Sequence, residues 1–496
     1  MIKLNRREFL KGTAWMGAAA VAAGCSTPRL GLGEGGKMAT YADRPMRKLR
    51  VGIVGLSRGL AGVNGFNVIP GCEITAICDI TAVRVNQVLE MIKEKGRPRP
   101  KVYTGSEEAW KGLCDDPNVD FVYNATPWQL HVPIALYAMR AGKHVATEVP
   151  SAFTVDECWE LVETSEKLQR HCMQLENCCY GEAEMLALNL CRQGVLGEIV
   201  HGEGGYIHDL RTGNYGDWQY DSKEPWWDDK NKCYAYWNHW RLRHNKDHKG
   251  NQYPTHGLGP VCWYMDINRG DRMDYLVSLE SEQRNFEAYA RAQYPADDWH
   301  AKVRVAMADM NTMLIKTKLG RSIMIQHDIS SPRPYSRINR VTGTIGSFEG
   351  IEFIEKGSKK TAGELAITSG SYCRFGWEEK AGAGVHSYFD EKKAAEMREV
   401  HKHPLWKQAG EIAKRMGGHG GMDFMMVLRI AYCLQNGLPL DQNVYDLASW
   451  CCLCELSEKS VRNRSCPMDI PDFTRGAWRT TPRLEVGAVD LARMGA

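Results

Sequence analysis

The chain has 496 residues, more than one hydrophobic core usually serves, so two domains are expected. Hydrophobic residues make up 43% of the chain and charged residues 25%, a balance that is ordinary for a globular enzyme and argues against disorder. The net charge of +3 is small for this length, and it gives no reason to expect a nucleic-acid partner or attraction to an anionic membrane surface.

The first residues have the features of an export signal. Residues 5–11 form a twin-arginine pattern, and the apolar segment 13–23 follows. A short buried helix is the alternative interpretation. The sequence before Cys25 also resembles a lipobox, with alanine where leucine is more usual, so Cys25 is a candidate lipid anchor. We expect residues 1–25 to be a twin-arginine signal that directs the protein to the periplasm or, as a lipoprotein, to the cell surface. We expect residues 26–47 to be a flexible tether.

The chain contains 17 cysteines, but a protein of this size does not need disulfides as its framework. Cys451, Cys452 and Cys454 form one Cys-x-x-Cys cluster, in a stretch from Tyr445 to Ser460 that has the character of a packed helix. No second ligand pair stands at zinc-site spacing. We therefore favour buried thiols over a zinc site and expect no metal.

A nucleotide-binding pattern begins at Leu49. Residues 49–55 form an apolar run that ends in glycine, as a buried parallel strand does. The turn over residues 56–62 then enters a helix, and such a turn brings backbone N–H groups against a pyrophosphate. Ser57 stands at the second glycine of the Gly-x-Gly-x-x-Gly fingerprint, so this loop alone is weak evidence for a dinucleotide site.

Asp79 strengthens the prediction of a dinucleotide site. It ends a second strand, expected over residues 73–79, where a carboxylate accepts hydrogen bonds from the adenosine ribose hydroxyls. The same negative charge repels a 2′-phosphate, so we expect NAD rather than NADP as the cofactor. The alternative role for Asp79 is that of a helix N-cap.

Strands and helices continue to alternate up to about residue 175. We expect a helix over residues 82–95, a strand over 120–126, a helix opened by Pro127–His131 and a strand over 144–148. This spacing indicates an α/β fold with a parallel, doubly wound sheet. The first domain is therefore predicted to be a Rossmann dinucleotide-binding domain over residues 48–175. Such sheets bind ligands at the carboxyl ends of their strands, where Thr126–His131 and Glu148 lie.

The pattern changes near Leu196. Residues 197–206, 313–318 and 321–327 alternate like strands, and helices return after about Val400, with one expected over Met422–Gln435. Aromatic residues gather from Trp218 to Trp240, either as a carbohydrate-stacking platform or as rings that close a loop onto the body. We expect residues 176–480 to form a second α/β domain, with C-terminal helices that pack back.

Eight motifs follow one another along the chain in a fixed order. They are Thr126-Pro-Trp128-x-x-His131, Gly142–Pro150, Leu175–Asn177, Gly205–Arg211, Tyr253–Pro260, Asn268–Asp271, Arg333–Tyr335 and His419–Phe424. Together they resemble the Gfo/Idh/MocA oxidoreductases and, within that group, glycoside hydrolase family 109, the NAD-dependent α-N-acetylgalactosaminidases. The resemblance runs from about Arg50 to Phe473. It implies a Rossmann domain followed by an open-faced α/β sheet domain.

The family resemblance implies a mechanism outside the usual pair of carboxylates. Tightly held NAD+ removes hydride from C3 of the sugar, and a base removes the acidified C2 proton. The glycosidic oxygen is eliminated from C1, water adds, and the hydride is returned, so the cofactor is not consumed. The substrate is then a glycoside, and we also expect a homo-oligomer.

The residues for proton transfer are expected in the second domain. Dehydrogenases of the superfamily carry Glu-Lys-Pro, whereas this chain has valine at position 149, which cannot exchange protons. His256 and Tyr253 are the natural replacements, because imidazole titrates near neutrality and nearby positive charge can activate a phenol. If the segment is helical, their spacing of three puts both on one face. Glu176 is a candidate acid–base or orienting group.

The same resemblance assigns the remaining site residues. The sugar pocket is expected to contain Tyr206, Arg241, Tyr253, Pro254, Thr255, His256 and Tyr335. The cofactor contacts are expected to be Ser57, Arg58, Asp79, Trp128, His131, Glu148, Val149 and Asn177. His419 and Asp423 either approach the active site or belong to a packing element.

Two other functions remain open from sequence. An ordinary NAD-dependent sugar oxidoreductase would produce NADH in proportion to the sugar oxidised. A surface-tethered carbohydrate-binding protein would leave the dinucleotide pattern unexplained. The sequence does not name the sugar or the anomer that is cleaved.

Overall fold

The computed structural model describes residues 35–216, 227–228, 233–356, 367–380, 382–490 and 493–494, without side chains for residues 227–228, 233–234, 351–356 and 367–372. The predicted signal, Cys25, the first part of the tether and most of the aromatic stretch from Trp218 lie outside the described residues. Within the described part of the chain, no helix has both the length and the apolar character needed to cross a membrane.

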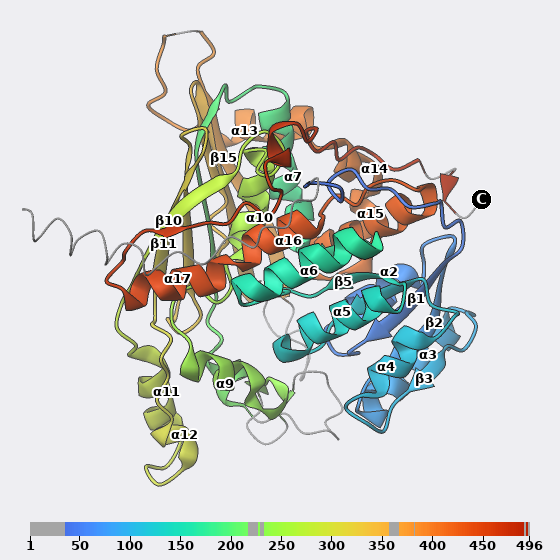
Figure 1. Ribbon diagram of the computed structural model, residues 1–496. Coiled ribbons are helices and arrows are strands. Elements are labelled where there is room, and N and C mark those ends of the chain that lie inside the picture. The colour runs from blue at the N-terminus through green and yellow to red at the C-terminus, as the bar shows by residue number, and fades with distance from the viewer. Residues whose placement is uncertain are drawn as a thin grey trace, which may run out of the picture. The chain divides into compact units, whose positions relative to one another are not determined.

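The first sheet has six parallel strands, which Figure 1 shows in blue to teal. The strands are β1 (Leu49–Val54), β2 (Cys72–Cys78), β3 (Lys101–Tyr103), β4 (Phe121–Asn124), β5 (His144–Thr147) and β6 (Cys172–Gln174). Their order is β3-β2-β1-β4-β5-β6, and the direction in which strands are added reverses between β1 and β4. A ligand crevice is expected beside that reversal, at the carboxyl ends of the strands.

Helices cover both faces of this sheet. They are α2 (Leu60–Phe66), α3 (Ala82–Glu94), α4 (Ala109–Asp115), η2 (Trp128–Leu130), α5 (His131–Arg140) and α6 (Val155–Leu168). Strands β4 and β5 are buried at every position, because helices exclude water from both sides of a parallel sheet. The prediction of a Rossmann fold is confirmed.

The second sheet is mixed and has eight strands. They are β7 (Ile199–Ile207), β10 (Met273–Glu280), β11 (Asn311–Thr317), β12 (Ser322–Asp328), β13 (Arg340–Gly343), β14 (Gly346–Lys356), β15 (Ile367–Trp377) and β16 (Met468–Asp469). Their order is β15-β14-β13-β7-β12-β11-β10-β16, and β7 pairs parallel with β12 while the other pairs are antiparallel. A separate two-stranded sheet joins β8 (Trp227–Asp228) to β9 (Cys233–Tyr234).

One face of the second sheet is covered by helices (Figure 1). The helices of this half are η3 (Asn177–Tyr180), α7 (Glu182–Arg192), α8 (Arg211–Tyr215), η4 (Trp237–His239), α9 (Trp240–Asp247), α10 (Thr255–Tyr264), α11 (Asn285–Gln293), α12 (Trp299–Lys302), α13 (Glu391–His401), α14 (Pro404–Met416), η5 (His419–Gly421), α15 (Met422–Asn436), α16 (Val444–Cys451), α17 (Leu453–Arg462) and η6 (Ala477–Arg479). On the other face Leu279 is 67% exposed and Leu314 is 50% exposed. The predicted open-faced sheet is therefore confirmed.

Helix α10 crosses β7 in direct backbone contact. A Cβ atom built on Gly257 would lie 2.1 Å from the backbone nitrogen of Gly205, and one on Gly204 would lie 2.2 Å from the carbonyl oxygen of Gly257. Glycines are therefore required on both elements, and they fix the depth of the helix against the sheet. This contact sets the position of His256, the neighbour of Gly257.

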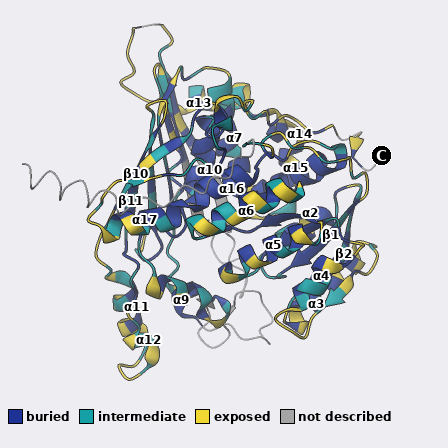
Figure 2. Cartoon of the chain, in the orientation of Figure 1, coloured by how far each residue is buried: buried dark blue, intermediate teal, exposed yellow. Residues whose placement is uncertain are grey.

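Helix α15 belongs to the core of the first domain as much as to that of the second. A Cβ atom on Gly65 of α2 would lie 2.6 Å from Cγ1 of Val427 on α15, and Gln435 donates a hydrogen bond to the carbonyl of Pro70. In Figure 2, α10, α15 and α16 are mostly dark blue, whereas α3, α4 and α6 present yellow outer faces. The C-terminal helices thus pack between the two sheets.

Residues 35–47 are packed on the body, so the prediction of a tether is wrong for them. Met38 is buried, the Tyr41 hydroxyl donates to the carbonyl of Gln169, and the Met46 amide donates to the carbonyl of Leu434. Apolar and aromatic side chains in this segment find partners that its Gly- and Pro-rich composition did not indicate.

The cysteine cluster consists of buried thiols, as predicted. Cys451, Cys452 and Cys454 are free and buried, and they lie where α16 gives way to α17. Burial raises the pKa of the Cys451 thiol to about 12.

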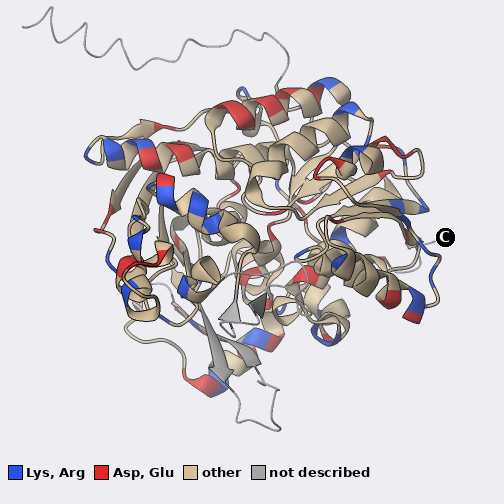
Figure 3. Cartoon of the chain, turned by 90° about the horizontal axis from the view of Figure 1, so that it is seen from below, with Lys and Arg blue, Asp and Glu red and all other residues tan. Residues whose placement is uncertain are grey.

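In the view of Figure 3, acidic and basic residues are interspersed along the described elements.

Candidate active site

A cavity of about 970 Å³ lies where the carboxyl ends of the Rossmann strands meet the second domain. At one end its wall consists of loops that follow β1, β2, β4 and β5. At the other end the wall comes from β7, α9, α10 and η5. The predicted site residues on this wall are Ser57, Arg58, Asp79, Trp128, His131, Glu148, Val149, Tyr206, Arg241, Tyr253 and His256, together with His419.

Two glycines give the first loop its close approach to the sheet. Gly55 has φ +83°, and a Cβ there would lie 2.5 Å from the carbonyl oxygen of Ala125. A Cβ on Gly59 would lie 2.1 Å from the carbonyl oxygen of Gly55. Without side chains at these two positions, the loop backbone lies close to the sheet at the edge of the cavity, as a dinucleotide-binding loop requires.

The Asp79 carboxylate organises the same end of the cavity. It accepts hydrogen bonds from the amide of Leu56 at 2.7 Å and from the amide and hydroxyl of Thr81 at 2.8 and 2.9 Å. Thr81 occupies the N-cap position of α3, so the alternative role of Asp79 as that cap is wrong. The carboxylate is partly exposed on the cavity wall, where it suits ribose hydroxyls.

Trp128 and His131 tie the loop after β4 to the loop after β5. The Trp128 indole donates to the carbonyl of Val149 at 3.1 Å. Both ring nitrogens of His131 lie against carbonyls, 2.7 Å from that of Pro150 and 2.8 Å from that of Thr126. Burial lowers the pKa of His131 to about 4, although the two carbonyls act in the opposite direction. Its polar atoms therefore serve the protein and not the cavity.

Arg58 connects the loop after β1 to two acidic side chains. Its Nε lies 3.1 Å from Glu148, and its Nη1 and Nη2 lie 2.9 and 3.1 Å from the two oxygens of Asp423. Asn177 donates to the same Asp423 carboxylate at 2.5 Å and is itself buried away from the cavity wall. Arg58 lies on the wall as predicted, whereas Asn177 acts through Asp423.

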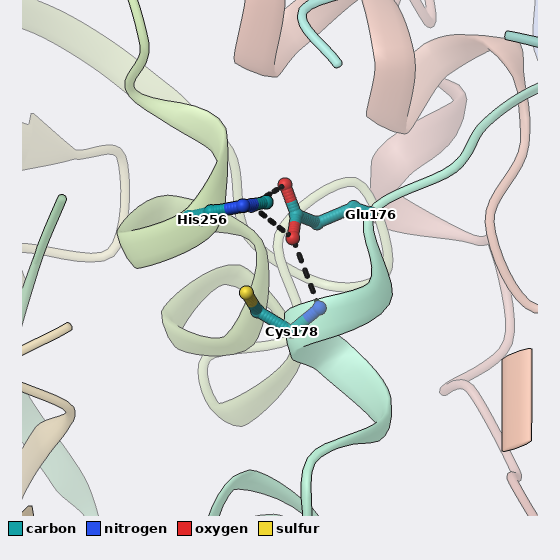
Figure 4. A group of neighbouring side chains, drawn as sticks. All are labelled: Glu176, Cys178 and His256. Carbon is teal, nitrogen blue, oxygen red and sulfur yellow. Dashed lines mark hydrogen bonds and ion pairs between the residues drawn. The ribbon is translucent and has the colours of Figure 1, made fainter. Parts of the chain in front are cut away.

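His256 and Glu176 form a buried hydrogen-bonded pair (Figure 4). Nδ1 of His256 lies 2.8 and 3.0 Å from the two oxygens of Glu176, and the amide of Cys178 donates to the same carboxylate at 3.0 Å. Burial lowers the pKa of His256, although Glu176 acts in the opposite direction. Burial opposes ionisation of Glu176, but His256, together with the Thr255 side chain and the Cys178 amide, holds the pKa of that carboxyl below its usual value. Glu176 therefore contacts the cavity only through His256.

Cys178 is the third member of this cluster, since ligand atoms of Glu176, Cys178 and His256 all lie within 4.8 Å of one another (Figure 4). Burial raises the pKa of the Cys178 thiol well above its usual value. The direct hydrogen bond between His256 and Glu176 makes this an orienting pair for the imidazole.

Tyr253 lies above His256 but outside the helix. Helix α10 begins at Thr255, and Pro254 precedes it, so the condition for a shared helix face, a helix that includes both residues, is not met. The Tyr253 hydroxyl nevertheless lies 3.4 Å from Nε2 of His256, and its ring stacks on Tyr206 at 4.5 Å. Burial raises the pKa of Tyr253 well above its usual value, so the expected activated phenol is instead a protonated donor.

Arg241 is surrounded by aromatic rings. Its guanidinium carbon lies 4.8 Å from the ring of Trp128 and 5.0 Å from that of Tyr253, and its Nη1 donates to the Tyr236 hydroxyl at 3.0 Å. The residue is 4% exposed, and its Nε and Nη2 have no hydrogen-bond partner among the described residues. An unsatisfied buried donor costs about 1–3 kcal/mol. These two donors are therefore candidates to bind a ligand oxygen in the cavity.

Three residues expected in the sugar pocket lie behind its wall. Pro254 and Thr255 are buried at the start of α10 and do not reach the cavity surface. The Tyr335 hydroxyl accepts from Arg337 at 3.1 Å, and its ring packs edge-on against Tyr206. Tyr335 thus supports Tyr206.

His419 supplies a further imidazole to the cavity, beside His131, His208 and His256. Gly417, Gly418, Gly420 and Gly421 all have positive φ, and so does His419 itself. Its side chain is 53% exposed, and its Nδ1 lies 3.0 Å from Asp423. Sequence left this residue between an active-site and a packing role, and the run of glycines was the signal for an exposed loop.

The chain is similar to known proteins over nearly its whole length. Residues 49–175 match the model described as oxidoreductase family, NAD-binding Rossmann fold, and residues 180–480 match glycosyl hydrolase 109, C-terminal domain. A glycosyl hydrolase family 109 protein of Shewanella pealeana is 42% identical over 97% of this chain and 98% of its own length. An alpha-N-acetylgalactosaminidase of Bacteroides fragilis is 43% identical over 88% of this chain and 95% of its own length.

Solved structures share the fold at low identity. An oxidoreductase domain protein from Kribbella flavida superposes with a TM-score of 0.59 at 15% identity, over 86% of this chain and 100% of that one. A levoglucosan dehydrogenase, solved with NADH and levoglucosan, gives a TM-score of 0.54 at 16% identity, with the same two coverages.

Proposed function

Because this chain belongs to glycosyl hydrolase family 109, and is thus a glycoside hydrolase with an NAD-binding Rossmann domain, we propose that it cleaves α-linked N-acetylgalactosamine from glycosides and uses its NAD without consuming it. The observation that carries the proposal is one cavity with two chemically different ends. Asp79 and the glycine loop suit a dinucleotide, and His256, Tyr253 and Arg241 suit a polar, sugar-sized ligand.

The residues present fit NAD. Gly55 and Gly59 leave no room for side chains between the first loop and the sheet, and Asp79 lies beside them on the wall. Ser57, Trp128, Glu148 and Val149 continue this wall toward the second domain and would hold the cofactor there. When bound, NAD supplies a hydride acceptor that later gives the hydride back to the sugar.

His256 is the proposed base at the sugar. Glu176 accepts from its Nδ1, which leaves Nε2 as the atom that takes a proton. The Tyr253 hydroxyl lies on the Nε2 side and, as a neutral phenol, donates a hydrogen bond to whatever oxygen or nitrogen lies there. In the triplet Glu148-Val149-Pro150, valine stands where related dehydrogenases have lysine, so the triplet has no side chain that can take the lysine's part in proton transfer. In the proposal, His256 and Tyr253 supply that proton transfer instead.

Arg241 and His419 complete the proposed site. The unpaired Nε and Nη2 of Arg241 bind an oxygen of the sugar, and the rings around the guanidinium exclude water from that contact. We propose that His419, whose exposed imidazole lies on the cavity wall, gives a proton to the departing glycosidic oxygen. General acid–base groups of this kind contribute about 10²–10⁴-fold to a rate.

Turnover of an aryl α-N-acetylgalactosaminide by the purified protein tests the proposal. We expect release of the aryl group without net NADH, NAD in the mass spectrum of the native protein, and deuterium uptake at sugar C2 during turnover in D₂O. Stoichiometric NADH from a free sugar would identify a sugar oxidoreductase instead. Failure to cleave any aryl glycoside would overturn the proposal.

We also propose export by the twin-arginine route, on the strength of residues 5–25. This route carries folded proteins, so the chain would bind its dinucleotide in the cytoplasm before export. Replacing Arg6 and Arg7 by lysine should leave the protein in the cytoplasmic fraction. Cys25→Ala should release it from the membrane fraction if Cys25 carries lipid.

A further inference from the structure

Asp423 contacts three side chains from three separate parts of the chain. One of its oxygens, Oδ1, accepts from Nη2 of Arg58 and from Asn177, and the other, Oδ2, accepts from Nη1 of Arg58 and from Nδ1 of His419. Arg58 belongs to the dinucleotide end of the cavity, and His419 belongs to the sugar end. The carboxylate is 2% exposed, so water does not compete for these contacts.

His419 depends on Asp423 for its position. Four glycines with positive φ surround it, and glycine restricts the backbone least of all residues. Among the residues that the structure describes, Asp423 is the one hydrogen-bond partner of the His419 ring. The loop also lies tightly against this carboxylate, because a Cβ on Gly418 would be 2.9 Å from Cβ of Asp423.

We infer that Asp423 is a positioning residue that couples occupation of the dinucleotide cleft to the placement of His419. A dinucleotide that contacts the wall at Arg58 restricts the guanidinium, and the two-pronged contact to Asp423 transmits this restriction to the imidazole. Nε of Arg58 also lies 3.1 Å from Glu148, so a second carboxylate faces the guanidinium. The loop of residues 417–421 is then ordered when the cofactor is present and looser when it is absent.

The coupling rests on the proposed function only for the chemical role of His419. Its structural part concerns NAD and a loop, and it can be measured without a glycoside. Failure of glycoside cleavage would therefore remove the proposed function and leave the coupling open to its own test.

The direct test is hydrogen–deuterium exchange of residues 417–421 in protein from which the NAD has been removed, before and after NAD+ is added back. In the natural protein, we expect NAD+ to slow exchange in this loop by about tenfold or more, the range of typical coupling between sites. In Asp423→Asn, which keeps the shape of the side chain and loses its charge, we expect NAD+ to leave exchange in the loop unchanged. An equal response to NAD+ in both proteins would overturn the inference.

Asp441→Asn is the matched control. Asp441 pairs with Arg429 of the same helix α15 at 2.7 Å, is equally buried, and lies off the cavity wall. Its loss should lower the melting temperature while the loop still responds to NAD+. If this variant also loses the response, general loosening of α15 explains the effect and the inference fails.

Asp423→Glu keeps the charge and is the second variant, should Asp423→Asn fold poorly. We expect it to restore a response of the loop to NAD+. In glycoside turnover, we expect Asp423→Asn to lower kcat roughly 100-fold, since misplacement of a catalytic group by about 1 Å has an effect of this size. KM should change little, because Arg241 and Tyr253 are untouched.

Discussion

Nδ1 of His256 lies 2.8 Å from a carboxylate oxygen of Glu176, although 80 positions separate the two residues in sequence. Glu176 follows β6, the last strand of the Rossmann sheet, and His256 lies in the first turn of α10 on the second sheet. The hydrogen bond therefore joins the segment just after the Rossmann sheet to the helix that lies on the second sheet. It fixes the tautomer of the imidazole and directs Nε2 toward the Tyr253 hydroxyl and the cavity.

The first prediction concerns pH. Glu176 raises the pKa of His256 while burial lowers it, so Glu176→Gln leaves burial unopposed and the pKa falls further. A neutral His256 is the active base, so the acid limb of the kcat/KM profile should move to lower pH. The maximum should fall about 100-fold, because the tautomer is no longer fixed. A profile from about pH 4 to about pH 8 decides this, and a shift toward higher pH would contradict it.

The second prediction concerns the Tyr253 hydroxyl. Tyr253→Phe keeps the ring stacked on Tyr206 and removes the donor that faces Nε2 of His256. We expect kcat to fall about 10- to 100-fold with little change in melting temperature. Tyr103→Phe, which removes a hydroxyl that donates to Asp116 and does not line the cavity, is the control. Unchanged kcat in Tyr253→Phe would remove this residue from the chemistry.

The third prediction concerns substrate affinity. Arg241→Met keeps an unbranched side chain among the rings and removes the two unpaired donors. A hydrogen bond to a charged group is worth about 1.5–3 kcal/mol, so KM for an aryl glycoside should rise about 10- to 100-fold. Arg241→Lys should not restore it, because a point charge lacks the fork of donors. Steady-state kinetics measure both, and full rescue by lysine would argue against this geometry.

The fourth prediction concerns cofactor retention. Asp79→Asn keeps a side chain of the same shape but loses the negative charge that holds the amides of Leu56 and Thr81. We expect less NAD to copurify with the protein and a weaker discrimination against NADP. The ratio of absorbance at 260 nm to that at 280 nm, followed by cofactor identification by mass spectrometry, measures both. If the variant keeps its full content of NAD, residues other than Asp79 retain the cofactor and this prediction is wrong.

The fifth prediction concerns the contact between α10 and β7. Gly257→Ala places a methyl group 2.1 Å from the backbone of Gly205, so the helix must move away from the sheet. Overpacking of this kind costs about 1–3 kcal/mol, and it displaces His256 with the helix. We expect both a lower melting temperature by calorimetry and a lower kcat. Gly487→Ala, which meets no atom within 4 Å, should be neutral.

The sequence predicted most of the Rossmann strands closely, because apolar runs that end in glycine or an acid have few other interpretations. It also identified which loops meet at the cavity. It did not predict the direction of each side chain, so Asn177, Thr255 and Tyr335 were expected on the wall and lie behind it. A strand end or a motif fixes where a backbone lies, whereas packing of neighbours decides which way a side chain points.

The contact between Arg58 and Asp423 could not be predicted for a different reason. The two residues are separated by 365 positions, and no local pattern links them. The expectation of a tether over residues 35–47 failed in a similar way. Composition indicates how flexible a segment is in isolation. It does not indicate the hydrogen bonds that Tyr41 and Met46 make with the rest of the folded protein.

The packing of α15 against α2 limits how relatives of this protein can be recombined. A chimaera that takes the first domain from one chain and everything after residue 175 from another would bring Gly65 and Val427 from different parents into one tight contact. Any mismatch in side-chain volume there would fall beside Asp423 and the glycine loop on the same helix. In such a chimaera, residues 417–436 should therefore come from the same parent protein as residues 49–175, although the two segments are far apart in sequence.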